Sequence, residues 1–391
     1  MEEFKKYKFG DIVNILDSKR IPLSATQREN RKGIYPYYGA QGIIDYIDDY
    51  IFDGTYLLIA EDGENLKSQK NNIAQIAIGK YWVNNHAHIV ESNGSCDIRY
   101  ICYLLNKIDI SGYITGSAQP KLNQANLQSI ELSLPSLTVQ KRIADYIDLF
   151  DSKISLNRRI NDNLEQQAQA LFKSWFVEKP NPQWTKGSLS DIASFVGGYS
   201  YKGDELVDSS NTGMATIKNY NRSGGFKTDG FKAINPSDKV KNAQYAELFE
   251  ILVAHTDLTQ NAEVIGNAEL VLSLGEYNKI IFSMDLVKVL PSSSFPYRFL
   301  IAAMLKNKLF TGHCQGYVNG TTVLHLNKKA LPEYKVMIPT DTEAKKMNEI
   351  LGGYYKRMSE NLKENDMLEQ LRDTILPKLM SGELKINDLN C

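Results

Sequence analysis

Two stretches of the chain share one pattern of seam positions, spaced alternately four and three residues apart, which predicts amphipathic helices. They run over residues 143–175 and 347–379, so each position in the second lies 204 residues after its counterpart in the first (347 − 143). Most seam positions are apolar, and each seam carries two asparagines near its centre. The seam residues that we expect to pack are Ile143, Ile147, Phe150, Ile154, Asn157, Asn161 and Leu164 in the first stretch and Met347, Leu351, Tyr354, Met358, Asn361, Asn365 and Leu368 in the second.

The spacing reads the same in both directions, so two antiparallel helices would bring each seam residue opposite another. Asn157 would then face Asn365, and Asn161 would face Asn361. A buried asparagine in such a seam lowers stability but fixes the register of the two helices. We therefore predict a helix pair with a single alignment. The alternative, two unrelated amphipathic helices, leaves the coincident asparagines unexplained.

The repeat extends beyond the two helices. Residues 116–123 match 320–327, and 134–135 match 338–339, all with the same shift of 204 (320 − 116), whereas residues 10–12 match 190–192 with a shift of 180 (190 − 10). Each copy contains a glycine turn, a short alternating strand and a proline before the long helix. The chain is therefore interpreted as one duplicated unit, a globular part followed by a helix, with an insertion in the second globular part.

Short apolar or alternating runs inside the globular parts predict strands at residues 56–60, 73–78, 131–134, 248–253, 285–290 and 334–338, and helices at 98–106 and 297–306. The prolines within residues 179–184 end the first long helix. We expect an α+β fold: two mixed α/β domains related by internal duplication, joined by two long helices that form an antiparallel coiled coil. The expected boundaries are 1–137 and 180–340 for the domains and 138–179 and 341–383 for the helices.

Composition narrows the class of protein. The 391 residues have room for two or three domains. Four cysteines stand at no metal-binding spacing, the start is charged, and no stretch has the length of a membrane span, so we expect a soluble, cytoplasmic protein. The net charge of −1 argues against a uniformly basic protein. Contact with nucleic acid would have to come from local basic patches.

Motifs for bond-making chemistry are missing. A methyltransferase needs a glycine-rich cofactor loop and an Asn/Asp-Pro-Pro-aromatic motif, but Asn181-Pro-Gln-Trp184, the nearest string, lacks the second proline. No phosphate-binding Gly-x-x-x-x-Gly-Lys-Ser/Thr string occurs. Two Glu-x-Lys triplets lie near the chain ends without a partnered aspartate, which disfavours a nuclease. We therefore expect no catalytic residue in this chain.

A histidine pair has three interpretations. His86 and His88 stand two residues apart on a predicted strand and would share one face. No cysteine or third histidine is nearby, so we expect no metal site. The two rings either pack beneath Trp82 or face DNA.

Loops rich in lysine, arginine, asparagine and glutamine are the candidates for base reading and phosphate contact. The strongest patch is Met214–Lys232, with glycines that allow close backbone approach. A solvated loop is the alternative in each case. The candidate DNA-binding residues are Lys218, Asn219, Tyr220, Asn221, Arg222 and Lys227 in the second half, and Lys67, Gln69, Lys70, His86, His88, Gln119 and Lys121 in the first.

Several segments resemble the specificity subunit of Type I restriction-modification systems, over essentially the whole chain. The resemblance lies in the tandem arrangement, in the segments 134–143 and 375–384, and in the first-half segments 35–44, 52–60 and 82–89. One departure is that the second copy, at 338–347, lacks the glutamine found at Gln140 in the first.

This resemblance implies a non-catalytic DNA reader whose two target recognition domains each bind half of a bipartite, gapped site. It also implies that the paired helices dock two methyltransferase subunits, and restriction subunits in some complexes, and that S-adenosylmethionine, ATP and Mg are held by those partners. Independently, a helix over 143–175 would be roughly 50 Å long at about 1.5 Å per residue. One DNA turn advances about 34 Å, so an unread gap between half-sites would follow. The rival interpretation is a coiled-coil scaffold or adaptor with two globular protein-binding heads.

Overall fold

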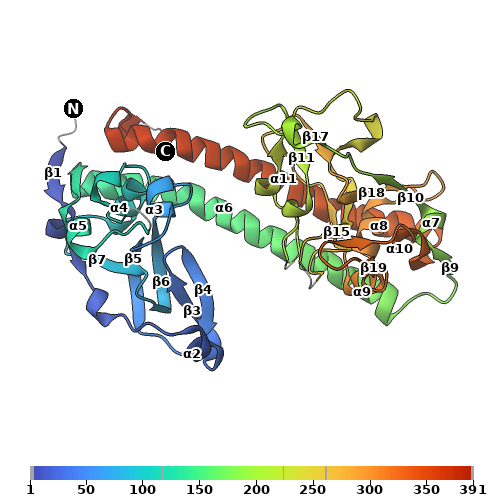
Figure 1. Cartoon of the computed structure of the whole chain (residues 1–391), viewed down its shortest axis with the longest axis horizontal. Coiled ribbons are helices and arrows are strands. Elements are labelled where there is room, and N and C mark those ends of the chain that lie inside the picture. Colours follow the sequence, from blue (N-terminus) through green and yellow to red (C-terminus); the bar gives the residue numbers. More distant parts are fainter. Residues whose placement is uncertain (1–3, 117–118, 223, 260–261, 389–391) are drawn as a thin grey trace. The chain divides into compact units, whose positions relative to one another are not determined.

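The computed structural model describes residues 4–116, 119–222, 224–259 and 262–388. The chain divides into two compact units, one made of residues 1–152 with 369–391 and the other of residues 153–368. Helices α6 (Leu137–Phe172) and α11 (Asp341–Ser381) each contribute to both units. The boundaries of the compact units therefore fall within the long helices (Figure 1).

The first unit is built on a mixed six-stranded sheet of order β2-β7-β5-β6-β3-β4, with a separate two-stranded sheet β1-β8. Strand β5 lies between β7 and β6 and is buried over its last four residues, with Leu57 and Ile59 fully buried in the core. Its elements are β1 (Lys5–Lys8), α1 (Phe9–Ile12), β2 (Val13–Ile15), η1 (Asp17–Lys19), α2 (Ala25–Glu29), β3 (Lys32–Gly39), β4 (Gly42–Ile47), β5 (Phe52–Ala60), α3 (Asn65–Ser68), β6 (Ala74–Val83), β7 (Ala87–Ser92), α4 (Ile98–Leu105), η2 (Ser111–Tyr113), α5 (Gln124–Ser129), β8 (Glu131–Leu134) and η8 (Ile386–Asp388).

The second unit contains sheets of order β10-β18-β14-β16, β12-β11-β17-β13, β15-β20-β19 and β21-β9. Its elements after α6 are the π-helical turn η3 (Lys173–Glu178), β9 (Thr185–Ser188), α7 (Leu189–Ile192), β10 (Ala193–Gly197), η4 (Gly203–Glu205), β11 (Thr212–Ala215), η5 (Ile217–Asn219), η6 (Thr228–Gly230), β12 (Lys232–Ala233), η7 (Asn242–Gln244), β13 (Tyr245–Ala246), β14 (Ile251–Ala254), β15 (Thr256–Asp257), β16 (Ala268–Leu270), β17 (Lys279–Phe282), β18 (Leu286–Pro291), α8 (Arg298–Leu305), α9 (Lys308–Gln315), β19 (Val318–Asn319), β20 (Leu324–Leu326), α10 (Ala330–Glu333) and β21 (Lys335–Ile338).

The internal duplication is visible in the strand register. In the first unit β1 pairs with β8 so that Lys5 lies opposite Leu134, and in the second β9 pairs with β21 so that Thr185 lies opposite Ile338. These pairs differ by the two shifts found in the sequence, 180 (185 − 5) and 204 (338 − 134). The order β2-β7-β5-β6 recurs as β10-β18-β14-β16. The predicted α+β fold with a duplicated architecture is confirmed.

Five of the eight strands and helices predicted in the globular parts lie within two residues of their observed bounds. Strand β5 begins four residues before the predicted 56, β6 ends five residues after the predicted 78, and a third predicted strand begins late. The run at 248–253 forms strand only from Ile251, because Phe249 has a φ of 68°, in the left-handed region that breaks an extended backbone. The strands outside this shared order differ between the units. In the first unit, β3 and β4 extend the same sheet beyond β6, whereas in the second unit a separate sheet is formed by β12, β11, β17 and β13. The duplicated halves therefore share a four-strand order, which we call the repeated frame, but not the strands around it.

Within the second unit, hydrogen bonds join both asparagine pairs that the seam spacing predicts. The Nδ2 of Asn157 donates to the Oδ1 of Asn365 at 2.9 Å, and the Nδ2 of Asn361 donates to the Oδ1 of Asn161 at 2.8 Å. All four side chains are buried. Because the residue numbers rise on one helix as they fall on the other, the two helix segments in this unit are antiparallel.

The seam is not confined to helix–helix packing. Met347, Leu351 and Met358 belong to the same buried cluster as Leu300 and Ile301 of α8. Ile143, Ile147 and Phe150 of the first unit are also buried. Leu164, Tyr354 and Leu368 of the second unit are only partly buried. The long helices are thus part of the cores of the globular units.

Candidate nucleic-acid interface

A groove of about 800 Å³ opens in the second unit between the segments 217–232 and 257–264. We call it the basic groove, because four cations line it against three acids: Lys218, Arg222, Lys227 and Lys232 against Asp229, Asp257 and Glu263. A concave surface with an excess of cations suits a phosphate backbone. It contains the patch that the sequence singles out as the strongest candidate.

Two predicted contact residues in this groove prove to be structural. Asn219 is fully buried; its Oδ1 accepts the N–H of Thr216 and its Nδ2 donates to the carbonyl of Lys227, both at 2.8 Å. Tyr220 is 4% exposed and packs edge-on against Phe226. The prediction that Asn219 and Tyr220 face DNA is therefore wrong, because both side chains build the wall of the groove from inside.

The other candidates of the groove remain accessible. Lys218, Asn221 and Arg222 are exposed and Lys227 is partly exposed. The Nε of Arg222 lies 3.0 Å from a carboxylate oxygen of Glu263, and the Nζ of Lys227 lies 3.9 Å from Asp229. The pair of Lys227 and Asp229 is at the surface and worth little in water, so exchange of this carboxylate for phosphate costs little. The Glu263 oxygen that faces Arg222 is buried, while the Arg222 side chain is 72% exposed.

The opposite wall of the groove was missed by sequence reasoning. The buried carboxylate of Asp257 accepts the N–H groups of Thr259 and Val264 at 2.8 Å and so holds these two residues, the near and far sides of one loop, at this wall. Burial alone would raise the pKa of Asp257, but these hydrogen bonds lower it below its usual value. The proximity of this loop to 217–232 comes from the pairing of distant strands, for which the local sequence gives no signal.

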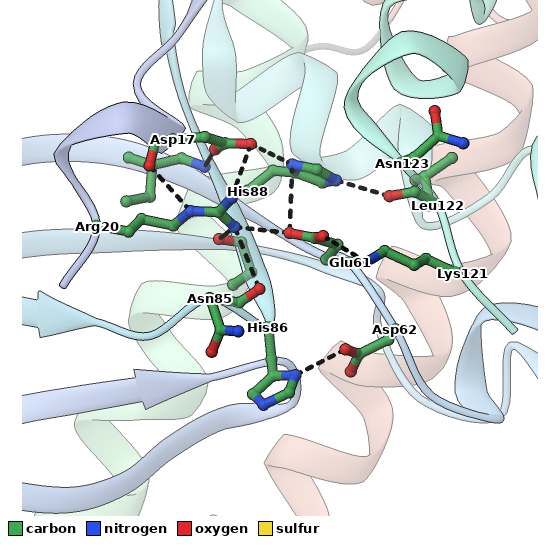
Figure 2. Close-up of polar contacts among 12 residues, drawn as sticks. Asp17, Arg20, Glu61, Asp62, Asn85, His86, His88, Lys121, Leu122 and Asn123 are labelled. Atoms are coloured by element: carbon green, nitrogen blue, oxygen red, sulfur yellow. Dashed lines mark hydrogen bonds and ion pairs between the residues drawn. The ribbon is translucent and has the colours of Figure 1, made fainter. Parts of the chain in front are cut away.

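In the first unit, His88 is the centre of a buried ionic network (Figure 2). Its Nδ1 lies 2.6 Å from the carboxylate of Asp17, and its Nε2 lies 2.7 Å from the carbonyl oxygen of Leu122. The guanidinium of Arg20 donates to Glu61 at 2.7 Å and to the carbonyl of Ala87 at 2.9 Å. Since a carboxylate and a carbonyl both accept, the His88 ring satisfies both contacts only with a proton on each nitrogen.

The cations of this network lower the pKa values of its two acids, Asp17 and Glu61. Burial alone would raise the pKa of Asp17, but the hydrogen bond and charge of His88 lower it below its usual value. The pKa of Glu61 is lowered in the same way: burial opposes the shift, and hydrogen bonds from Arg20 and Lys121 and the charge of His88 produce it. Both carboxylates are therefore held in the ionised form.

The structure corrects the interpretation of the histidine pair. His88 is 1% exposed and bound on both nitrogens, so it cannot contact DNA, and it packs against Asp17 and Leu122 instead of lying beneath Trp82. His86 lies in the turn after β6, outside a strand, with its exposed ring 2.6 Å from Asp62. His86 remains a candidate for DNA contact, and His88 does not.

Sequence reasoning also missed the partners that gather around His88. Ligand atoms of Asp17, Glu61 and His88 lie within 4.8 Å of one another, as in a metal site. Arg20 already bridges the two carboxylates, at 3.3 Å from Asp17 and 2.7 Å from Glu61, and supplies the positive charge that a metal would bring. The cluster is best described as a self-neutralising ion network.

This network borders the remaining first-unit candidates. Two backbone hydrogen bonds join Thr115 and Lys121 across the glycine turn at Gly116, and the Nζ of Lys121 lies 3.2 Å from Glu61. Gln119 and Lys121 are exposed on this turn. A backbone bond from Gly63 to Pro120, at 3.1 Å, links the turn to the segment that carries exposed Lys67, Gln69 and Lys70. The side chain of Gln69 donates to the carbonyl of Ile108 at 3.2 Å and stays exposed, so Lys67, Gln69 and Lys70 all remain candidates.

The second unit repeats the backbone of this site without its charges. Leu122 donates to the carbonyl of Glu61 at 2.8 Å, and Leu326, its counterpart at 204 (326 − 122), donates to the carbonyl of His255 at 2.8 Å. Val287 occupies the place of His88 in the strand register. The ionic network is thus particular to the first unit, whereas the turn beside it is common to both.

Comparison with known proteins gives consistent results. Residues 1–166 and 181–370 match the family model described as the Type I restriction modification DNA specificity domain. A Type I restriction enzyme specificity subunit of Methanocaldococcus jannaschii is 23% identical over 99% of this chain and 98% of its own. A putative type I restriction enzyme specificity subunit of Haemophilus influenzae is 36% identical, but the match spans only 35% of each chain.

Among solved structures, the S subunit of a Type-I restriction-modification system from M. genitalium has a similar fold. The TM-score is 0.59 at 16% sequence identity, over 97% of this chain and 96% of the other. No helix within the described residues is both long and apolar enough to cross a membrane.

Proposed function

The chain belongs to the Type I restriction-modification DNA specificity family, and we propose that it is the non-catalytic subunit that reads a bipartite, gapped DNA site for such a complex. Two recognition domains would each read one half-site. The long helices would dock two methyltransferase subunits and, where present, restriction subunits. S-adenosylmethionine, ATP and Mg would be held by these partners.

The observation that carries the proposal is the repeated frame with unlike loops. The strand order β2-β7-β5-β6 of the first unit recurs as β10-β18-β14-β16 in the second, and the backbone bond of Leu122 recurs at Leu326. The basic groove, in contrast, lies in the second unit and the His88 network in the first. A repeated frame presents two reading surfaces, and unlike loops let them read unlike sequences. A single chain would thus specify two different half-sites.

Roles within the basic groove follow from side-chain chemistry. Lysine acts as a point charge toward phosphate, so Lys218 and Lys227 suit backbone contact. The forked guanidinium of Arg222, at 72% side-chain exposure, and the amide of Asn221 suit hydrogen bonding to base edges. In the first unit, His86, Gln119 and Lys121 offer the equivalent contacts.

The test of the proposal is a genome-wide methylation map made with and without this chain, co-expressed with its cognate methyltransferase. We expect methylation of a split motif that disappears when the chain is absent. A contiguous, ungapped motif would refute the bipartite assignment. Duplex binding that is weak and blind to sequence would instead favour the protein-binding scaffold, because specific binding commonly exceeds nonspecific binding by about 10³ or more.

Variants of the groove separate the two kinds of contact. We expect Lys227→Gln to weaken binding to every duplex and to reduce the slope of log K against log salt by about one. Arg222→Gln should relax preference at one half-site only. Exposed Lys239, which does not line the basic groove, is the matched control, and Lys239→Gln should leave both quantities unchanged. Equal loss of preference at both half-sites on replacing Arg222 would refute its role.

A further inference from the structure

A second buried ion cluster lies behind the basic groove and has no role in the proposal above. It joins Glu269 of β16, Lys306 at the end of α8 and Glu165 of α6. The side chains of Glu269 and Lys306 are each 8% exposed, and the ammonium of Lys306 contacts both carboxylates, that of Glu165 at 3.3 Å. The three groups come from three separate elements of the second unit.

Glu269 also holds a loop of the groove. Its Oε1 accepts the backbone N–H of Gly225 at 2.7 Å, while its Oε2 contacts Lys306. Gly225 in turn accepts the N–H of Asn221 through its carbonyl, at 2.9 Å. One buried carboxylate thus connects the helical core to the turn that carries Asn221 and Arg222.

The turn depends on such a support because its backbone is unusual. Gly224 and Gly225 have φ values of 93° and 98°, which glycine adopts readily and other residues rarely do. Glycines leave a free turn many conformations, so a bond from outside the turn adds to its own backbone hydrogen bonds in fixing its side chains. The hydrogen bond from Gly225 to Glu269 is that outside bond.

Lys306 is held in its charged ammonium form. Burial alone would lower the pKa of Lys306, but the charges of Glu269 and Glu165 raise it above its usual value. A buried ion cluster is a poor means of adding stability, since well-packed apolar residues often do as well. An ion cluster instead fixes the orientation of its charged groups. Here the contact with Lys306 orients the Glu269 carboxylate so that its other oxygen accepts the N–H of Gly225.

We propose that Glu269 is a positioning residue for sequence reading in the second half-site: it fixes the backbone at Asn221 and Gly225 by tying Gly225 to Lys306 and, through Lys306, to α6. The inference rests on the proposed function of the basic groove. It assigns no DNA contact to Glu269 itself, which is buried.

The experiment compares Glu269→Ala with a matched control, Glu250→Ala, in the complex co-purified with methyltransferase. Glu250 is another buried carboxylate of the second unit, and it pairs with buried Lys288 at 2.9 Å. Among the residues that the structure describes, it shares no hydrogen bond or ion pair with Asn221, Arg222, Gly224 or Gly225. Both variants remove a buried ion pair and should lower the melting temperature. The binding probes are duplexes that carry the motif identified by the methylation map, and duplexes in which one half-site of that motif is altered.

We expect Glu269→Ala to reduce discrimination in one half-site about tenfold while leaving discrimination in the other half-site and nonspecific affinity unchanged. Glu250→Ala should leave all three unchanged. Glu269→Gln keeps an oxygen that can accept from Gly225, so it should retain more discrimination than Glu269→Ala. Hydrogen exchange at residues 221–226 should quicken in Glu269→Ala.

Two outcomes overturn the inference and are distinguishable. If Glu269→Ala and Glu269→Gln keep wild-type discrimination at both half-sites, the positioning role is wrong and the proposed function stands. If the wild-type protein itself shows no preference for the motif, the proposed function fails, and the role of Glu269 in reading fails with it.

Discussion

Replacement of the asparagine layer formed by Asn161 and Asn361 tests how the helix pair is specified. The Nδ2 of Asn361 donates to the Oδ1 of Asn161 at 2.8 Å, and the Nδ2 of Asn161 donates to the carbonyl of Met358 at 3.2 Å. Asn361 is 1% exposed and Asn161 8% exposed. We compare Asn361→Leu, Asn161→Leu and the double variant.

The single change Asn361→Leu removes the donor to Asn161 and leaves a buried acceptor unpaired. An unsatisfied buried polar group costs about 1–3 kcal/mol, which sets the expected loss. In the double variant no amide remains unpaired in this layer, and a buried leucine contributes about 1.5–3 kcal/mol relative to an exposed one. The double variant should therefore be at least as stable as the better single variant, with a coupling energy of about 1–3 kcal/mol.

Urea unfolding monitored by circular dichroism gives the midpoint of each variant and hence the coupling energy. Because the seam then retains only the layer of Asn157 and Asn365, we also expect the double variant to give broader cross-linking patterns between cysteines placed along α6 and α11. Additive losses in the double variant would refute the reasoning, since they would mean that the two amides do not satisfy each other.

Three further predictions follow from local contacts. The pKa of Asp17 is held below its usual value, so its stabilising contribution is complete above about pH 4 and lost as the pH falls through the folded-state pKa; Asp17→Asn should flatten the acid branch of a melting-temperature profile, and an unchanged branch would contradict this. Gly116→Ala should cost about 1–3 kcal/mol in chemical unfolding, because φ is 84° and the new Cβ would lie 2.2 Å from a backbone oxygen, whereas Gly112→Ala, with open space around it, should be near neutral. Asn219→Ala should lower the melting temperature by more than the exposed control Asn221→Ala, and equal effects would argue against a structural role for Asn219.

The sequence was sufficient for features that repeat or follow a helical period. The seam spacing predicted which asparagines pair, since helix geometry alone decides which residues share a face. The shift between Gly116 and Gly320 predicted a recurring turn, and both glycines have positive φ values, 84° and 114°. Such features depend on residues close together in the chain or on an exact copy.

Features that depend on distant partners could not be predicted in this way. His88 belongs to the interior because pairing of β5 with β7 brings it near Glu61, and because η1 places Asp17 beside it. The local sequence indicates that Asn219 is a polar loop residue, but hydrogen bonds to Thr216 and Lys227 direct its side chain into the interior. For both residues, amino-acid type indicated polarity correctly but could not indicate which polar partner satisfied it.

The composition of the first compact unit has a consequence for protein synthesis. This unit combines residues 1–152 with residues 369–391, and Leu376 and Leu379 are buried within that part of the molecule. While a ribosome is still translating residues 153–368, the first compact unit lacks its last segment. This unit is complete only after translation has passed residue 369, whereas by then every residue of the second unit has been made.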